Sequence, residues 1–206
     1  MSTPTAYSGQ ESVKTALVSN YVRQKTDLGS TPVSTVTFNE YGDGRDITTV
    51  LTLTNFVGGT LAGAAAALGV GNIVYSFPAS PSQHLELVYA FSNLTATAAG
   101  TATTGVVGLG SVIASGAVAV LSGTATFQNR VTAQAITTGP TGGTAIAALT
   151  GATAGIGTGI SLNVAANVKN VFLNTAATWA ADNTGSLLYN GQIILKWTLM
   201  GAGASS

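Results

Sequence analysis

Few residues of this chain could carry out acid–base or metal chemistry. His84 is the only histidine, and the chain has no cysteine. A Ser-His-Asp arrangement would therefore have to be built on His84 alone, and a zinc site would lack ligands. His84 stands directly before a candidate strand, so we interpret it as a turn or edge residue.

The acidic residues around the first predicted hairpin are the second candidates. Glu40, Asp43 and Asp46 surround Arg45. A pair of carboxylates could serve a glycosidase, but a solvated turn with local ion pairing explains these residues more simply. The segment lacks the alternating acidic residues of a calcium loop. We therefore predict no enzymatic activity, no bound metal and no cofactor.

Two further motifs have low specificity. The glycine series Gly155–Gly159 resembles a phosphate-binding loop only in its glycine content, because no Lys-Ser/Thr follows it. Asn93-Leu94-Thr95 matches a glycosylation acceptor, which is a common chance match. The first residues do not have the form of a secretory signal, so we expect the chain to stay in the cytoplasm where it is made.

The distribution of charge is the strongest physical signal in the sequence. Nine of the fourteen charged residues precede position 47, and the later ones are Glu86, Arg130, Lys169, Asp182 and Lys196. A soluble domain normally has about a quarter of its residues charged. We therefore expect most of the surface to meet protein and the chain to form a homo-oligomer. Net charge is zero and no basic run exists, so we expect no direct contact with nucleic acid.

Short apolar or alternating segments separated by turn residues predict a mainly β protein. Leu51 and Leu53 should face one way along their strand, and the segments 72–77 and 85–91 should form an antiparallel pair. We predict an antiparallel β-sandwich or jelly roll. The expected strands cover 33–39, 46–56, 72–77, 85–91, 125–137, 159–164, 170–174 and 191–200.

Bulky aromatic residues and small-residue segments fill the rest of this domain. We expect Trp179, Trp197 and Tyr189 in the core, with interface anchoring as the alternative. The Ala/Gly/Thr-rich segments 57–71 and 139–159 are expected to be long loops, either flexible or ordered against another subunit. The most apolar window, residues 106–121, is too short to predict a membrane span.

The N-terminal residues form a separate unit in this prediction. Residues 9–27 contain a plausible short helix with apolar residues at steps of three and four. We predict an arm over residues 1–32 and a single β-sandwich domain with long loops over residues 33–206. The candidate partner-binding residues are Tyr7, Val13, Leu17 and Tyr21.

The order of these segments resembles that of a known protein family. A polar arm with a short helix is followed by DITTVLTLTNFVGGT, a small-residue loop, and NIVYSFPAS leading into LELVYAF. This pattern resembles small structural proteins of tailed bacteriophages, in particular the capsid decoration or cement proteins. The resemblance covers residues 46–91 in pattern and the whole chain in composition.

The resemblance implies a trimeric β-sandwich or jelly-roll subunit on the outer face of an icosahedral capsid in the virion. There it would stabilise the shell by bridging major capsid subunits, with the arm over residues 2–27 reaching onto the capsid. Two alternatives remain open: a tail or head-fibre component involved in host attachment, and a carbohydrate-binding β-sandwich that would need an exposed aromatic residue such as Trp179.

Overall fold

The protein is mainly β, as the sequence predicts, and its strands form one curved sheet. A computed structural model describes residues 24–25, 29–31, 33–42, 46–63, 66–78, 83–140, 146–148 and 169–200. The strands are β1 (Gln24–Lys25), β2 (Val36–Gly42), β3 (Asp46–Ala62), β4 (Gly69–Ser76), β5 (Gln83–Thr97), β6 (Thr103–Gly110), β7 (Val131–Gly139), β8 (Ile146–Ala148), β9 (Asn170–Ala176) and β10 (Thr184–Met200).

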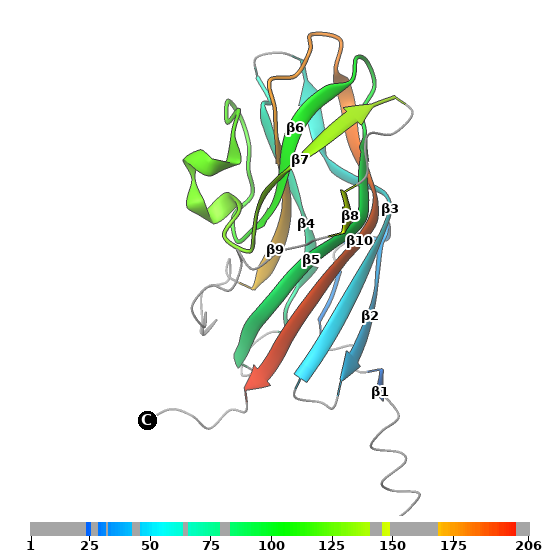
Figure 1. Ribbon diagram of the computed structural model, residues 1–206, viewed down its shortest axis with the longest axis vertical. Coiled ribbons are helices and arrows are strands. Elements are labelled where there is room, and N and C mark those ends of the chain that lie inside the picture. Colours follow the sequence, from blue (N-terminus) through cyan, green and yellow to red (C-terminus); the bar gives the residue numbers. More distant parts are fainter. Residues whose placement is uncertain are drawn as a thin grey trace, which may run out of the picture.

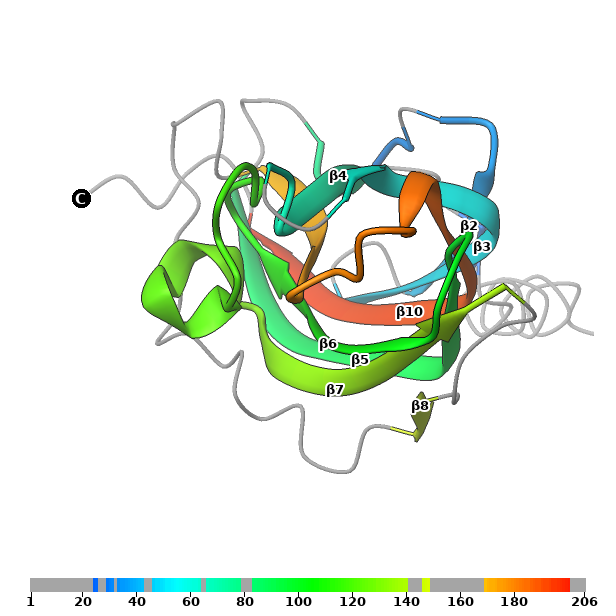
Figure 2. The ribbon, with the colours of Figure 1, turned by 90° about the horizontal axis from the view of Figure 1, so that it is seen from above.

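The sheet curls until it is nearly closed into a barrel. Its ten strands follow the order β1-β2-β3-β10-β5-β7-β6-β9-β4, with β8 beside β5. Seen along the long axis, the strands curve around a common interior (Figure 2). Neighbouring strands are antiparallel except β5 and β7, which pair in parallel over two residue pairs only. The described residues thus form one mixed sheet.

Three long central strands give the sheet its curvature. β3 and β10 have 17 residues each and β5 has 15, and they run side by side through the length of the molecule (Figure 1). All three are irregular at the same level, where Asn55 and Asn93 have φ of 49° and Gly191 has φ of 131°. The Asn55 N–H donates to Asn190 Oδ1 at 2.9 Å across this level. Such bulges bend and twist strands, which lets a long sheet curl.

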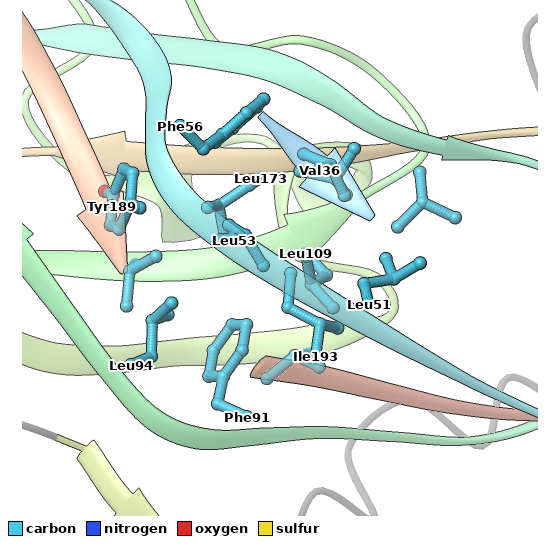
Figure 3. Packing of buried hydrophobic residues seen from close by; sticks show 14 of the residues in the cluster. Val36, Leu51, Leu53, Phe56, Phe91, Leu94, Leu109, Leu173, Tyr189 and Ile193 are labelled. Atoms are coloured by element: carbon cyan, nitrogen blue, oxygen red, sulfur yellow. The ribbon is translucent and has the colours of Figure 1, made fainter. Parts of the chain in front are cut away.

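The concave side of the sheet holds the hydrophobic core. Leu51 and Leu53 of β3 are buried, as their alternation predicts, and Ile193 and Leu195 of β10 lie beside them. Figure 3 shows Leu51, Leu53 and Ile193 converging with Phe91 and other side chains from facing strands. Aliphatic side chains from opposite walls therefore fill the barrel.

Two predictions about strands are wrong. Residues 57–71 are not a long loop, because β3 continues to Ala62 and β4 begins at Gly69. Their small residues fit close packing instead: a Cβ on Gly58 would collide with the Tyr189 ring. The segments 72–77 and 85–91 do not pair with each other, because β4 pairs with β9 and β5 with β10. Local alternation identifies a strand but carries no information about its partner.

Other boundaries also differ from expectation. β7 begins at Val131, and residues 125–127 form a 3-10 turn. The window 106–121 begins as the end of β6, and in the described part of the chain no helix is long and apolar enough to cross a membrane. The predicted strand 159–164 and helical residues 9–23 lie outside the described residues, whereas Gln24–Lys25 form β1.

Residues 111–130 leave the sheet between β6 and β7 and lie outside it (Figure 1). We call this segment the β6–β7 excursion. Its Leu121 is buried against Ala114 and Ala176 of β9. Asn174 of β9 fastens it further: Nδ2 donates to the carbonyls of Val112 and Phe127 at 2.8 and 2.9 Å, and Oδ1 accepts from the Ala114 N–H at 2.9 Å. One buried amide thus holds three points of the excursion.

Asn174→Ala should loosen the excursion without unfolding the barrel. The substitution leaves three backbone groups without their partner, so the free energy of unfolding should fall by roughly 1–3 kcal/mol. Hydrogen exchange should accelerate in residues 111–128 specifically. Asn39→Ala, at an exposed position of β2, is the matched control, and equal exchange in the two variants would contradict this role.

Candidate interaction surface

The acidic residues of the first hairpin do not act together in the structure. β2 and β3 form the expected hairpin, but Asp43 and Arg45 lie outside the described residues. Asp46 is exposed and accepts a hydrogen bond from Thr198 Oγ1 at 2.7 Å. The interpretation of Glu40 as part of a solvated turn is wrong, because its side chain is fully buried. Its position four residues after the buried Val36 places it on the inner face of β2, a period-two signal the sequence contains.

Glu40 is the centre of a buried hydrogen-bond network. Its Oε1 accepts from Tyr75 Oη and, at 3.1 Å, from Thr49 Oγ1. Its Oε2 accepts from the Gly29 N–H at 3.3 Å. Thr49 Oγ1 in turn accepts from Trp197 Nε1 at 2.9 Å. The network joins β2, β3, β4 and β10 to the segment that precedes β2.

Aromatic rings extend this network through the barrel. Phe77 packs edge-on against Tyr75 and Trp197, with ring centroids 5.1 and 5.3 Å apart. The buried Arg130 guanidinium lies 6.0 Å from the Phe77 ring and 5.9 Å from the Tyr89 ring. Arg130 NH1 also donates to the carbonyls of Gly110, at 2.9 Å, and of Asn170. Among the described residues, the buried side chains of Glu40 and Arg130 therefore each connect separate strands.

The large aromatic residues of the C-terminal third lie in the core, as predicted. Trp179, Trp197 and Tyr189 are each no more than 1% exposed. Trp179 Nε1 donates to the Leu68 carbonyl at 3.2 Å. A sugar could not stack on Trp179 in this position, so the carbohydrate-binding alternative loses the residue on which it depended.

The remaining sequence motifs do not come together at one place. His84 lies in β5 opposite Leu199, near the start of that strand. Asn93 is exposed at the bulge of β5, while Gly155–Gly159 lie outside the described residues. Among the residues that the structure describes, no group of three or more His, Cys, Asp or Glu residues could hold a metal ion. The candidate partner-binding residues Tyr7, Val13, Leu17 and Tyr21 also lie outside them.

The outer side of β2, β3, β10 and β5 forms a surface that the motifs did not identify. Strand pairing aligns its side chains in three rows of four, because every second residue of each strand points outward. We call this surface the four-strand face. Its rows are Thr37–Thr52–Gln192–Ser92, Asn39–Val50–Ile194–Ala90, and Tyr41–Thr48–Lys196–Val88.

The four-strand face is poor in charge and rich in short side chains. Lys196 is the one charged residue of its three rows. Tyr41 and Val88 at opposite ends of one row are 36% and 37% exposed, and Val50 and Ile194 are half-buried between their neighbours. A shallow groove of about 460 Å³ runs between Tyr41 and Lys196. The face is thus weakly polar and open to contact.

The excursion carries a second set of exposed apolar side chains. Val112, Ile113 and Val120 are 40%, 43% and 56% exposed. Residues 111–129 contain no charged residue. The excursion covers the outer side of β6 and β9 with Leu121 while turning these three side chains outward. The charge-poor composition is therefore displayed at the surface in two places.

No protein-family model matches the chain, and the searches of curated proteins and of solved structures found no match either.

The buried tyrosines should make the fold sensitive to alkali. Burial, together with the Glu40 charge and hydrogen bond, raises the pKa of Tyr75, and burial raises the pKa of Tyr189. The folded state therefore keeps both hydroxyls neutral, while the unfolded chain ionises them above a pKa of about 10. Their contribution to stability is fully present below pH 10 and is lost as the pH rises further.

Tyr189→Phe should weaken this dependence. Above pH 10, the free energy of unfolding should fall with pH less steeply in this variant than in the parent protein. The two slopes should differ by about 1.4 kcal/mol per pH unit. Urea unfolding at a series of pH values measures the slope. Tyr41→Phe, at an exposed position, is the matched control, and an unchanged slope in Tyr189→Phe would show that Tyr189 ionises in the folded protein.

Proposed function

We propose that this protein is a structural subunit of a tailed-phage virion that decorates the outside of an icosahedral capsid and stabilises it by bridging major capsid subunits. The four-strand face is the observation that carries the proposal. A surface with one charge in three rows suits many weak apolar and backbone contacts, repeated around a symmetric particle. The segment pattern over residues 46–91 supplies the resemblance to decoration proteins.

The size of the face indicates what else is needed. With strands about 4.8 Å apart and rows about 6.8 Å apart, its twelve positions cover roughly 400 Å². A stable interface buries about 800 Å² on each partner. The four-strand face supplies about half of such an interface, so a second surface must add to it.

The N-terminal arm is that second surface in our proposal. β1 pairs with β2 through Lys25 and Tyr41, so the arm joins the barrel at the edge of the four-strand face. Arm residues Tyr7, Val13, Leu17 and Tyr21 would then contact the same capsid subunits as the face. The described arrangement supports this because β1, which follows these residues in the chain, lies beside β2 at the edge of the face.

The strand arrangement also supports the finer prediction of a sandwich. One half of the sheet is β1-β2-β3-β10-β5 and the other is β7-β6-β9-β4. They are joined at β5 and β7 by two residue pairs. We propose that the halves act as the two layers of a sandwich whose edges have merged.

Ile194→Lys should test the face directly. Native mass spectrometry of the parent protein should show a trimer, and purified capsids should bind it at hundreds of copies per particle. Lysine at the centre of the face should raise the dissociation constant from capsids by at least about tenfold, because a charge must be desolvated there. Thr132→Lys, at an exposed site on β7, is the control. Unchanged capsid binding by Ile194→Lys would reject the face, and a handful of copies per particle would indicate a tail or fibre component instead.

Deleting residues 2–23 should test the arm. The deletion keeps β1, so the barrel should remain folded, with an unchanged near-ultraviolet spectrum from its buried Trp179 and Trp197. Capsid binding should be lost, because the face alone provides too little area. Retained binding would remove the arm from the proposal while leaving the face in it.

A further inference from the structure

The curled sheet has two edge regions, at β2 and at β4, and a short segment from the beginning of the chain lies between them. Gln24 and Lys25 pair with Gly42 and Tyr41 of β2. Ser30 pairs with Ser76 of β4: each N–H donates to the other's carbonyl, at 2.9 and 2.8 Å. Gly29–Thr31 therefore close the barrel, and we call them the closing segment.

Glu40, Tyr75 and Ser76 of the barrel form a specific binding site for this segment, and we call this site the acceptor. Glu40 Oε2 accepts the Gly29 N–H, and Tyr75, which donates to the same carboxylate, lies against the Gly29 backbone. A Cβ at position 29 would collide with the Tyr75 ring, so only glycine fits there. Glu40, Tyr75 and Ser76 thus recognise a glycine and its backbone followed by a strand-like residue.

The acceptor favours occupation by a segment of this kind. Without the segment, the buried Glu40 carboxylate loses a donor and the Ser76 backbone loses two hydrogen bonds, and unsatisfied groups of this kind cost about 1–3 kcal/mol each. Nothing in this requirement specifies which copy of the chain supplies the segment. The same contacts form whether it comes from the same chain or from a second one.

The connection between the closing segment and β2 determines which source is used. Thr31 Oγ1 donates to the Val36 carbonyl at 3.0 Å, and the Val36 N–H donates to the Val33 carbonyl at 3.2 Å, so the chain reverses within a few residues. Tight connections of this kind favour exchange, because straightening them relieves the turn. A groove of about 390 Å³ lies beside Val33–Thr35, bordered by Phe56 and Asn72.

We propose that, in the oligomer, the acceptor of each copy binds the closing segment of a second copy. This proposal rests on the homo-oligomer of the proposed function and specifies how it is built. Exchange joins the subunits through the same contacts that the segment makes within one chain. In a cyclic exchange around a threefold axis, the acceptor of every subunit is occupied. The arm that precedes the segment then emerges from a neighbouring barrel.

The absence of cysteine in the chain permits a direct test. Ser30→Cys in ¹⁵N-labelled chains and Ser76→Cys in unlabelled chains are refolded together and oxidised. An antiparallel hydrogen-bonded pair has Cα atoms about 5.5 Å apart, which suits a disulfide. A disulfide-linked dimer with the mixed isotopic mass is expected at a level at least about tenfold above that of Ser30→Cys paired with Ser186→Cys, because exchange holds the two cysteines at high effective concentration.

The outcomes separate this proposal from the proposed function. A mixed disulfide dimer above the control level supports exchange. A native trimer without it overturns exchange and leaves the capsid proposal intact, whereas a protein that is monomeric by native mass spectrometry overturns both.

If either cysteine variant fails to fold, Gly29→Ala provides the second measurement. Its Cβ should expel the closing segment and dissociate the oligomer, while Gly123→Ala, where a Cβ meets open space, should not. A Gly29→Ala protein that remains oligomeric would also overturn exchange.

Discussion

The fold depends on a buried carboxylate at the place where the curled sheet closes. Glu40 is removed from water, so its oxygens need hydrogen-bond donors from the protein. Those donors come from Tyr75 on β4, Thr49 on β3 and the backbone of Gly29. Each donor belongs to a different segment, so satisfying the carboxylate brings the two edge regions of the sheet together.

Small residues explain how so much strand surface fits into a narrow barrel. Glycine lies where another backbone or ring approaches too closely for any side chain, as at Gly58 against Tyr189 and Gly29 against Tyr75. At Gly191, a Cβ would lie 2.6 Å from the Asn93 carbonyl, at the level where three strands bulge together. The Ala/Gly/Thr composition is therefore a packing property of the described strands as well as a surface property.

Much of the strand content could be predicted from the sequence, because alternation such as Leu51–Leu53 or Ile193–Leu195 reports directly which side chains are buried. Alternation is interrupted in β4, where Tyr75 is buried and Ile73 only half-buried, because the register shifts between them. Partner choice could not be predicted, since β4 finds β9 about a hundred residues later in the chain. The Glu40 network could have been suspected from its inward position in β2. The four-strand face could not, because it exists only once four strands are placed in register.

The two halves of the sheet differ in whether the chain itself covers their outer sides, and this difference bears on assembly. On β6 and β9, the chain covers its own outer side with the excursion, using Leu121 and the three hydrogen bonds of Asn174. On β2, β3, β10 and β5, outward residues of similar size, such as Val88 and Tyr41, remain exposed. Apolar outer side chains are thus covered by the chain itself on β6 and β9 and remain exposed on β2, β3, β10 and β5. Since β1 pairs with β2 beside the open side, a partner bound on that side would also lie next to the point where the N-terminal residues leave the barrel.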